Sequence, residues 1–185
     1  NASCSSASPA RHRPGNLVLV VDDDPGILAL VEDVLGEAGL DTRRAGSGFE
    51  AVSQSVLLPL PDLLLIDYRL PDMSVSEVLD GLREAGLPLP FVIMTGSGGE
   101  QAAVDMMRLG AHDYLVKDAR FADALTGVVS AALARVKDSR LQTLLRTIEA
   151  ADSINTMASI LVSHLYAWSG VEAVGLRLRM GRSEE

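Results

Sequence analysis

Short apolar runs alternate with amphipathic stretches along the first two thirds of the chain. Most of the runs carry Leu, Ile or Val at consecutive positions, a pattern typical of strands that are covered on both faces of a parallel sheet. A weaker and more polar run follows the first of them. The predicted strands cover residues 17–21, 41–45, 62–67, 91–95 and 114–116.

The segments between these runs predict helices. In the first, apolar residues recur at three- and four-residue steps, Pro25 suits the first turn of a helix, and Gly39 supplies a stop. Strands that alternate with helices in this way indicate a parallel sheet with helices on both faces. The other predicted helices cover 47–57, about 75–85 and about 100–109, and a last one begins near Phe121.

The C-terminal third has a different pattern. Residues 121–150 contain no proline, and their apolar residues recur at helical spacing from Leu133 to Ile148. The last helix is therefore expected to continue as an amphipathic connector. A further helix and an alternating strand are expected over 153–168 and 171–180. The predicted organisation is a disordered tail (1–15), an α/β domain (16–135), a helical linker (136–152) and a partial sensory or output module (153–185).

Composition and charge narrow the function. Among the 185 residues, 25 Asp and Glu outnumber 16 Lys and Arg, so a basic nucleic-acid-binding surface is not expected. The single cysteine, Cys4, excludes an internal disulfide and a cysteine-rich zinc site, and fits a reducing compartment. No apolar run approaches the roughly 20 residues that a membrane helix needs. We therefore expect a cytoplasmic protein without a membrane partner.

The predicted strands end on polar residues. Asp22 and Asp23 follow the first strand, Asp67 ends the third, Thr95 ends the fourth, and Lys117 follows the fifth. In a parallel α/β sheet the carboxyl ends of the strands share one edge, where binding sites gather. Grouped carboxylates repel one another unless a cation lies among them, and Mg²⁺ prefers carboxylate and carbonyl oxygens.

A lysine and a hydroxyl beside such a metal site favour phosphoryl transfer, in which positioning and charge neutralisation supply most of the catalysis. The Lys117 ammonium suits a phosphoryl oxygen, and the Thr95 hydroxyl can donate to another. Asp67, at the end of the central strand, is then the natural nucleophile and would form an acyl phosphate.

Four motifs give the chain a recognisable pattern: VVDDDP, LLLIDYRLPDMS, VIMTGSG and GAHDYLVKD, in this order. With them, residues 16–135 resemble the receiver domain of two-component response regulators. The resemblance implies a flavodoxin-like, doubly wound sheet of five parallel strands in the order 2-1-3-4-5, here with a C-terminal helical extension. It also implies phosphoryl transfer to Asp67 from a histidine kinase or a phosphotransfer protein in a phosphorelay.

The resemblance assigns further roles. Asp22, Asp23 and Asp67 would hold Mg²⁺ together with the backbone carbonyl of Arg69, whose side chain would flank the phosphoryl site. Thr95 and Lys117 would contact the phosphoryl oxygens. Tyr114 occupies the position of an aromatic switch, whose ring turns inward when Thr95 engages the phosphoryl group.

Departures from the family pattern keep other functions open. Asp118 follows Lys117 where the family usually has a cis proline, and Val75 stands where glycine is common. An alternative is therefore a receiver-like scaffold that binds a partner without phosphorylation. A metal-dependent phosphohydrolase would need a substrate-specifying cap or a second acid two residues after Asp67, and position 69 is Arg.

The segment after residue 147 resembles the opening helix and first strand of a GAF sensory domain. An apolar stripe on a helix gains most of its stability by packing, and a second copy of the chain is the nearest partner. We therefore expect a homodimer formed through the C-terminal helices. The receiver is expected to be a signalling switch rather than a turnover enzyme.

Overall fold

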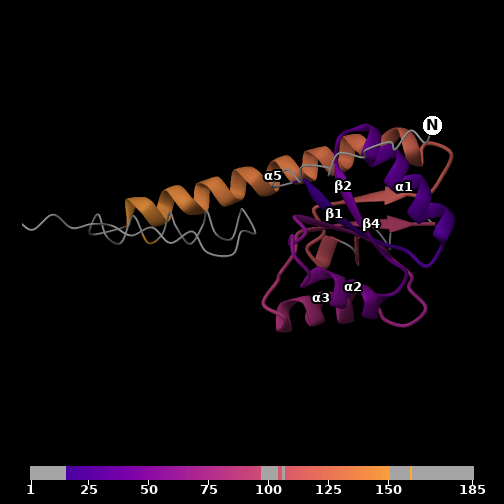
Figure 1. Ribbon diagram of the computed structural model, residues 1–185, viewed down its shortest axis with the longest axis horizontal. Coiled ribbons are helices and arrows are strands. Elements are labelled where there is room, and N and C mark those ends of the chain that lie inside the picture. Colours follow the sequence, from indigo (N-terminus) through magenta and orange to yellow (C-terminus); the bar gives the residue numbers. More distant parts are fainter. Residues whose placement is uncertain (1–15, 97–103, 106, 151–158, 160–185) are drawn as a thin grey trace, which may run out of the picture. The chain divides into compact units, whose positions relative to one another are not determined.

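The computed structural model describes residues 16–96, 104–105, 107–150 and 159. Its elements follow the predicted alternation (Figure 1). The strands are β1 (Leu17–Val21), β2 (Asp41–Ala45), β3 (Leu63–Asp67), β4 (Phe91–Thr95) and β5 (Asp113–Val116), and the helices are α1 (Pro25–Glu37), α2 (Gly48–Ser55), α3 (Val75–Glu84) and α5 (Phe121–Glu149).

The five strands form one sheet in the order β2-β1-β3-β4-β5, and every pairing is parallel. The register places Val21 beside Ile66, Asp67 beside Met94, and Thr95 beside Val116. The predicted strand order is thereby confirmed. The polar residues that end β1, β3, β4 and β5 consequently lie along one edge of the sheet.

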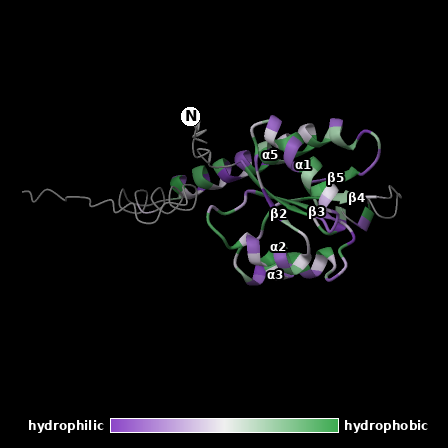
Figure 2. Cartoon of the chain, turned by 45° about the vertical axis from the view of Figure 1, so that its right-hand side comes forward, coloured by the Kyte–Doolittle hydropathy of each residue, from purple (hydrophilic) through white to green (hydrophobic). Residues whose placement is uncertain are grey.

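Helices cover both faces of the sheet (Figures 1 and 2). The core on one face joins Val18 and Val20 of β1 to apolar residues of α1 and α5. The core on the other face joins Leu19 and Val21 to residues of α2 and α3. Because alternate residues of a strand point to opposite faces, a strand covered on both sides needs apolar residues at every position. This explains the continuous apolar runs.

Local signals define the helix ends. The Asp24 side chain accepts hydrogen bonds from the backbone N–H groups of Gly26 and Ile27 at the start of α1. Gly39 takes a positive φ of 76° after the end of α1, which glycine adopts without steric cost. At the start of α3, Ser74 and Glu77 form a capping box.

The polar strand β2 lies at the edge of the sheet. Its Arg43 guanidinium donates to three backbone carbonyls, those of Gln54, Leu57 and Pro59, at 2.7–2.9 Å. These contacts hold the segment that follows α2, which ends at Ser55 rather than at the predicted residue 57. The predicted helix is therefore correct in type but too long.

Helix α5 is continuous from Phe121 to Glu149, so the predicted continuation of the last receiver helix is confirmed over this range. Its buried residues end at Val136. Leu133 is only 3% exposed and packs in the core with β5 and α1. The apolar stripe predicted from Leu133 to Ile148 is therefore wrong as a single surface for a partner, because Leu133 lies in the core; the exposed large apolar residues of α5 are Leu141 and Leu145.

By its contacts the chain divides into two compact units, Asn1–Val136 and Lys137–Glu185. The tail predicted at 1–15 lies outside the described residues, as do the helix and strand predicted at 153–168 and 171–180, except for Ser159. Of the helix predicted at about 100–109, residues 104, 105, 107 and 108 are described and are helical.

Candidate phosphoryl-transfer site

Lys117 joins the ends of three strands. Its Nζ lies 2.5 Å from Oδ2 of Asp22, after β1, and 3.0 Å from Oδ1 of Asp67, at the end of β3. The side chain of Asp22 is 1% exposed and that of Lys117 is 15% exposed, so these ion pairs are largely shielded from solvent. The single ammonium thus offsets part of the repulsion between the two carboxylates.

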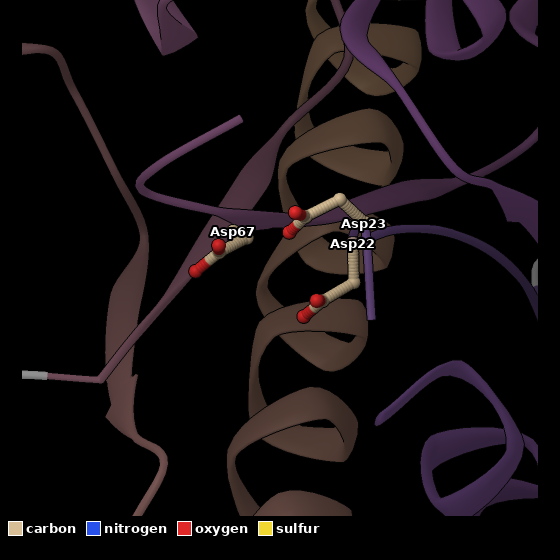
Figure 3. A group of neighbouring side chains, drawn as sticks. All are labelled: Asp22, Asp23 and Asp67. Atoms are coloured by element: carbon tan, nitrogen blue, oxygen red, sulfur yellow. The ribbon is translucent and has the colours of Figure 1, made fainter. Parts of the chain in front are cut away.

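A third carboxylate, that of the exposed residue Asp23, lies beside those of Asp22 and Asp67 (Figure 3). Asp22, Asp23 and Asp67 each offer an oxygen, and these oxygens lie within 4.8 Å of one another. A purely carboxylate donor set, open on the side of Asp23, fits a hard divalent cation such as Mg²⁺, which keeps several of its waters. The three predicted carboxylate ligands are therefore brought together.

The charges of the cluster are coupled. Burial raises the pKa of Asp22 above its usual value, and hydrogen bonds from Lys117 and the Asp24 N–H offset part of that effect. Burial alone would lower the pKa of Lys117, but its hydrogen bonds to Asp22 and Asp67 outweigh burial and raise it. Lys117 therefore stays charged at neutral pH, and its ammonium stabilises the charged form of Asp22 that burial disfavours.

Thr95 lies beside this cluster at the end of β4. Thr95 is only 3% exposed, and its backbone carbonyl accepts a hydrogen bond of 2.7 Å from the backbone N–H of Lys117. Tyr114 of β5 is 38% exposed, so its ring is on the surface. The predicted switch pair thus comprises a buried threonine and a partly exposed tyrosine on adjacent strands.

Arg69 is exposed and lies in the loop between β3 and α3. Its guanidinium reaches towards the end of β4, since a side-chain carbon built at Gly96 would lie 3.9 Å from an Arg69 terminal nitrogen. The side chain thus lies near the residue after Thr95. The family resemblance assigned this side chain to the flank of the phosphoryl site, and the supply of the Arg69 backbone carbonyl to a metal stays a prediction.

The loop after β5 differs from the usual family arrangement. The described residues contain one cis peptide bond, Leu58–Pro59, so the bond between Lys117 and Asp118 is trans. The Asp118 side chain accepts from the N–H of Arg120, and its carbonyl accepts from that of Phe121. Asp118 therefore forms the turn into α5, and Lys117 still reaches its partners.

Sequence reasoning missed Asp72. Its carboxylate lies in the loop between β3 and α3 and accepts hydrogen bonds from the N–H groups of Gly48 and Phe49, each at 3.0 Å. These groups belong to the first turn of α2, more than 20 residues earlier in the chain. A Pro-Asp pair in a loop is common turn chemistry, so no local signal pointed to this long-range contact.

Comparison with known proteins identifies the family. The family model of the response regulator receiver domain matches residues 18–128. The chain therefore belongs to the response regulator receiver domain family, and its sheet order and helix arrangement are those of the CheY-like, flavodoxin-like fold.

Individual relatives and solved structures support the assignment to this family. The chain is 35% identical to the luminescence regulatory protein LuxO of Vibrio campbellii over 114 residues, which are 62% of this chain and 25% of LuxO. The crystal structure of NtrX from Brucella abortus has a TM-score of 0.64 at 30% identity, with 76% of this chain and 32% of that chain covered. The receiver domain of the Francisella response regulator 1452 has a TM-score of 0.57 at 28% identity, with 66% and 98% covered. The chain thus matches about a quarter of LuxO.

Among the residues that the structure describes, none of the helices combines the length and the apolar character needed to cross a membrane.

Proposed function

We propose that the receiver domain accepts a phosphoryl group on Asp67 from the phosphohistidine of a histidine kinase or phosphotransfer protein. A carboxylate oxygen of Asp67 bonds to phosphorus while the P–N bond breaks, and the histidine nitrogen keeps the electron pair. The observation that carries this proposal is the Lys117 ammonium, held between Asp22 and Asp67 at the carboxyl edge of the sheet. Because the Lys117 ammonium already lies beside Asp67, it can pair with the oxygens of a phosphoryl group added there.

The metal in this proposal is Mg²⁺, held by Asp22, Asp23, Asp67 and the backbone carbonyl of Arg69. When bound, the cation neutralises charge on the phosphoryl oxygens. The clustering of the three carboxylates within 4.8 Å supports this assignment. Asp22 is preorganised for the role, because the backbone N–H of Asp24 and the Lys117 ammonium hold its two oxygens.

The response to phosphorylation is proposed to run through Thr95 and Tyr114. The Thr95 hydroxyl donates to the phosphoryl group, and the Tyr114 ring turns from its exposed position towards the space beside β4. The domain is then a switch that controls an attached module, and its chemistry is self-phosphorylation rather than turnover.

We further propose a cytoplasmic location and no binding of nucleic acid by this segment. The proposed division of the chain is a tail (1–15), the receiver (16–135), a linker (136–152) and a GAF-like start (153–185).

Phosphoryl uptake tests this function directly. Protein incubated with Mg²⁺ and a small phosphodonor is expected to gain one phosphoryl group by intact-mass analysis. Asp118 and Val75 depart from the family pattern, and the alternative that they support is a scaffold that binds a partner without phosphorylation. A wild-type protein that gains no phosphoryl group while it binds Mg²⁺ would favour the scaffold.

Asp23→Ala is expected to weaken Mg²⁺ binding by about tenfold or more, because it removes one of three clustered carboxylates. Isothermal titration calorimetry measures the effect. Asp33→Ala is the matched control, since Asp33 is an exposed carboxylate of α1 outside the cluster. Equal affinities for the two variants would contradict the assignment of Asp23 as a ligand.

We also propose that the C-terminal helices form a homodimer. Leu141 is 44% and Leu145 57% exposed in α5, and Leu144 and Ile148 are partly exposed.

Leu144→Glu is expected to shift the protein towards monomer, because it buries a charge in an apolar seam. Light scattering at micromolar concentration measures this. Gln142→Glu adds the same charge at an exposed polar position of α5 and is expected to leave the mass unchanged. A monomeric wild-type mass would exclude the dimer.

A further inference from the structure

The loop between β3 and α3, residues 68–74, is fixed at several points. It begins directly after Asp67, and the N–H of Tyr68 donates to the carbonyl of Met94 in β4. Arg69 and Ser74 form an isolated antiparallel bridge that closes the loop on itself. The loop therefore has a defined shape at the point where the Arg69 carbonyl would meet the metal.

Asp72 ties the middle of this loop to the start of α2. Both of its oxygens are used, one by the N–H of Gly48 and the other by the N–H of Phe49, each at 3.0 Å. These hydrogen bonds, that from Phe49 foremost, hold the pKa of the Asp72 carboxyl below its usual value, so the carboxylate is charged at neutral pH. Helix α2 already has its own N-cap, since Ser47 accepts from the N–H of Glu50. The Asp72 contact is thus additional to ordinary capping.

The packing beside this contact leaves little room for movement. A side-chain carbon at Gly48 would lie 2.7 Å from Cβ of Met73 and 2.8 Å from a methyl group of Val78. The backbone of α2 therefore approaches the loop closely, and it can do so because residue 48 is glycine. Hydrogen bonds and close packing together tie the loop to the first turn of α2.

We propose that Asp72 is a positioning residue for the metal site, and this inference rests on the proposed binding of Mg²⁺ near Asp67. By anchoring the loop three residues after Arg69, Asp72 restricts the positions of the Arg69 carbonyl before the cation arrives. Without the anchor, the loop must be ordered when Mg²⁺ binds, and affinity falls. Coupling between two equilibria is reciprocal, so Mg²⁺ must also strengthen the contact between Asp72 and α2.

The first test compares Mg²⁺ affinities by calorimetry. Asp72→Ala is expected to bind Mg²⁺ about tenfold more weakly than the wild type, the usual scale for groups that orient metal ligands. Asp72→Asn keeps one acceptor oxygen but places an NH2 donor against the second backbone N–H, so only part of the anchor remains and an intermediate affinity is expected.

Two control variants make the comparison specific. Ser47→Ala removes the cap that α2 supplies for itself but leaves the Asp72 contact, so Mg²⁺ affinity should stay within about twofold of the wild type. Asp80→Ala removes an exposed carboxylate of α3 that pairs with Arg83, and it should behave similarly. A loss in Ser47→Ala as large as that in Asp72→Ala would mean that α2 stability alone is responsible, and it would overturn the proposal.

Hydrogen exchange in the wild type supplies an independent readout. Mg²⁺ is expected to slow exchange of the Gly48 and Phe49 amides several-fold, and to have no such effect in Asp23→Ala. Unchanged exchange at these amides in Mg²⁺-bound wild type, or wild-type affinity in Asp72→Ala, would overturn the role of Asp72. A wild-type protein that does not bind Mg²⁺ at all would instead contradict the proposed metal site itself.

Discussion

Asp67→Asn is expected to abolish phosphoryl uptake from a small phosphodonor in the presence of Mg²⁺, with a rate loss on the order of 10³-fold or more. The amide is isosteric with the carboxylate but is a poor nucleophile towards phosphorus. Because the two side chains have nearly the same shape, and an amide oxygen can still accept from Lys117, 3.0 Å from Asp67, the substitution changes the chemistry more than the packing. Intact-mass analysis detects the adduct, and hydroxylamine sensitivity identifies it as an acyl phosphate.

The control for this experiment is Asp33→Asn, the same substitution at an exposed position of α1, which should gain the phosphoryl group at the wild-type rate. Peptide mapping of the wild-type adduct should place it on the peptide that contains Asp67. An adduct that persists on Asp67→Asn at the wild-type level would show that another residue is the acceptor.

Most of the fold could be predicted because burial leaves a direct mark on the sequence. β3 is buried at every position from Leu63 to Asp67, and its residues are correspondingly apolar up to the final acid. The end of α2 could not be predicted in the same way. Val56 and Leu57 continue the apolar pattern, but the Arg43 guanidinium takes the carbonyls of Gln54 and Leu57 and holds the chain outside the helix.

The prediction that Leu133 belongs to the apolar stripe of the connector was wrong for a related reason. A helix that packs on its own sheet and a helix that packs on a partner both repeat at three- and four-residue steps, so spacing cannot distinguish them. In the structure Leu133 belongs to the core shared with α1 and β5, whereas Leu141 and Leu145 are exposed. Only the tertiary contacts show which apolar residues of α5 pack on the sheet and which are exposed.

The site was more predictable than the loops around it. Parallel strands bring their carboxyl ends to one edge whatever their spacing along the chain, so Asp22, Asp67 and Lys117 could be grouped from strand positions alone. The contact of Asp72 with α2 depends on how the loop after β3 meets the start of that helix. No periodicity or motif encodes that meeting.

Lys117→Ala is expected to lower the free energy of unfolding by about 3 kcal/mol in the absence of Mg²⁺. The substitution leaves Asp22 and Asp67 without their shared counter-charge, and the Asp22 side chain is only 1% exposed. Millimolar Mg²⁺ is expected to restore much of that loss, because the cation replaces the missing positive charge. Denaturant unfolding with and without Mg²⁺ measures both effects.

Arg83→Ala is the matched control, since it also removes one cation from an ion pair, here the exposed pair with Asp80. Exposed pairs contribute little, so its effect should stay below about 1 kcal/mol and should not respond to Mg²⁺. Equal losses in the two variants would mean that solvent already screens the Lys117 cluster. A loss in Lys117→Ala that Mg²⁺ does not reduce would separate the cluster from the metal site, because a bound cation must compensate the charges that it touches.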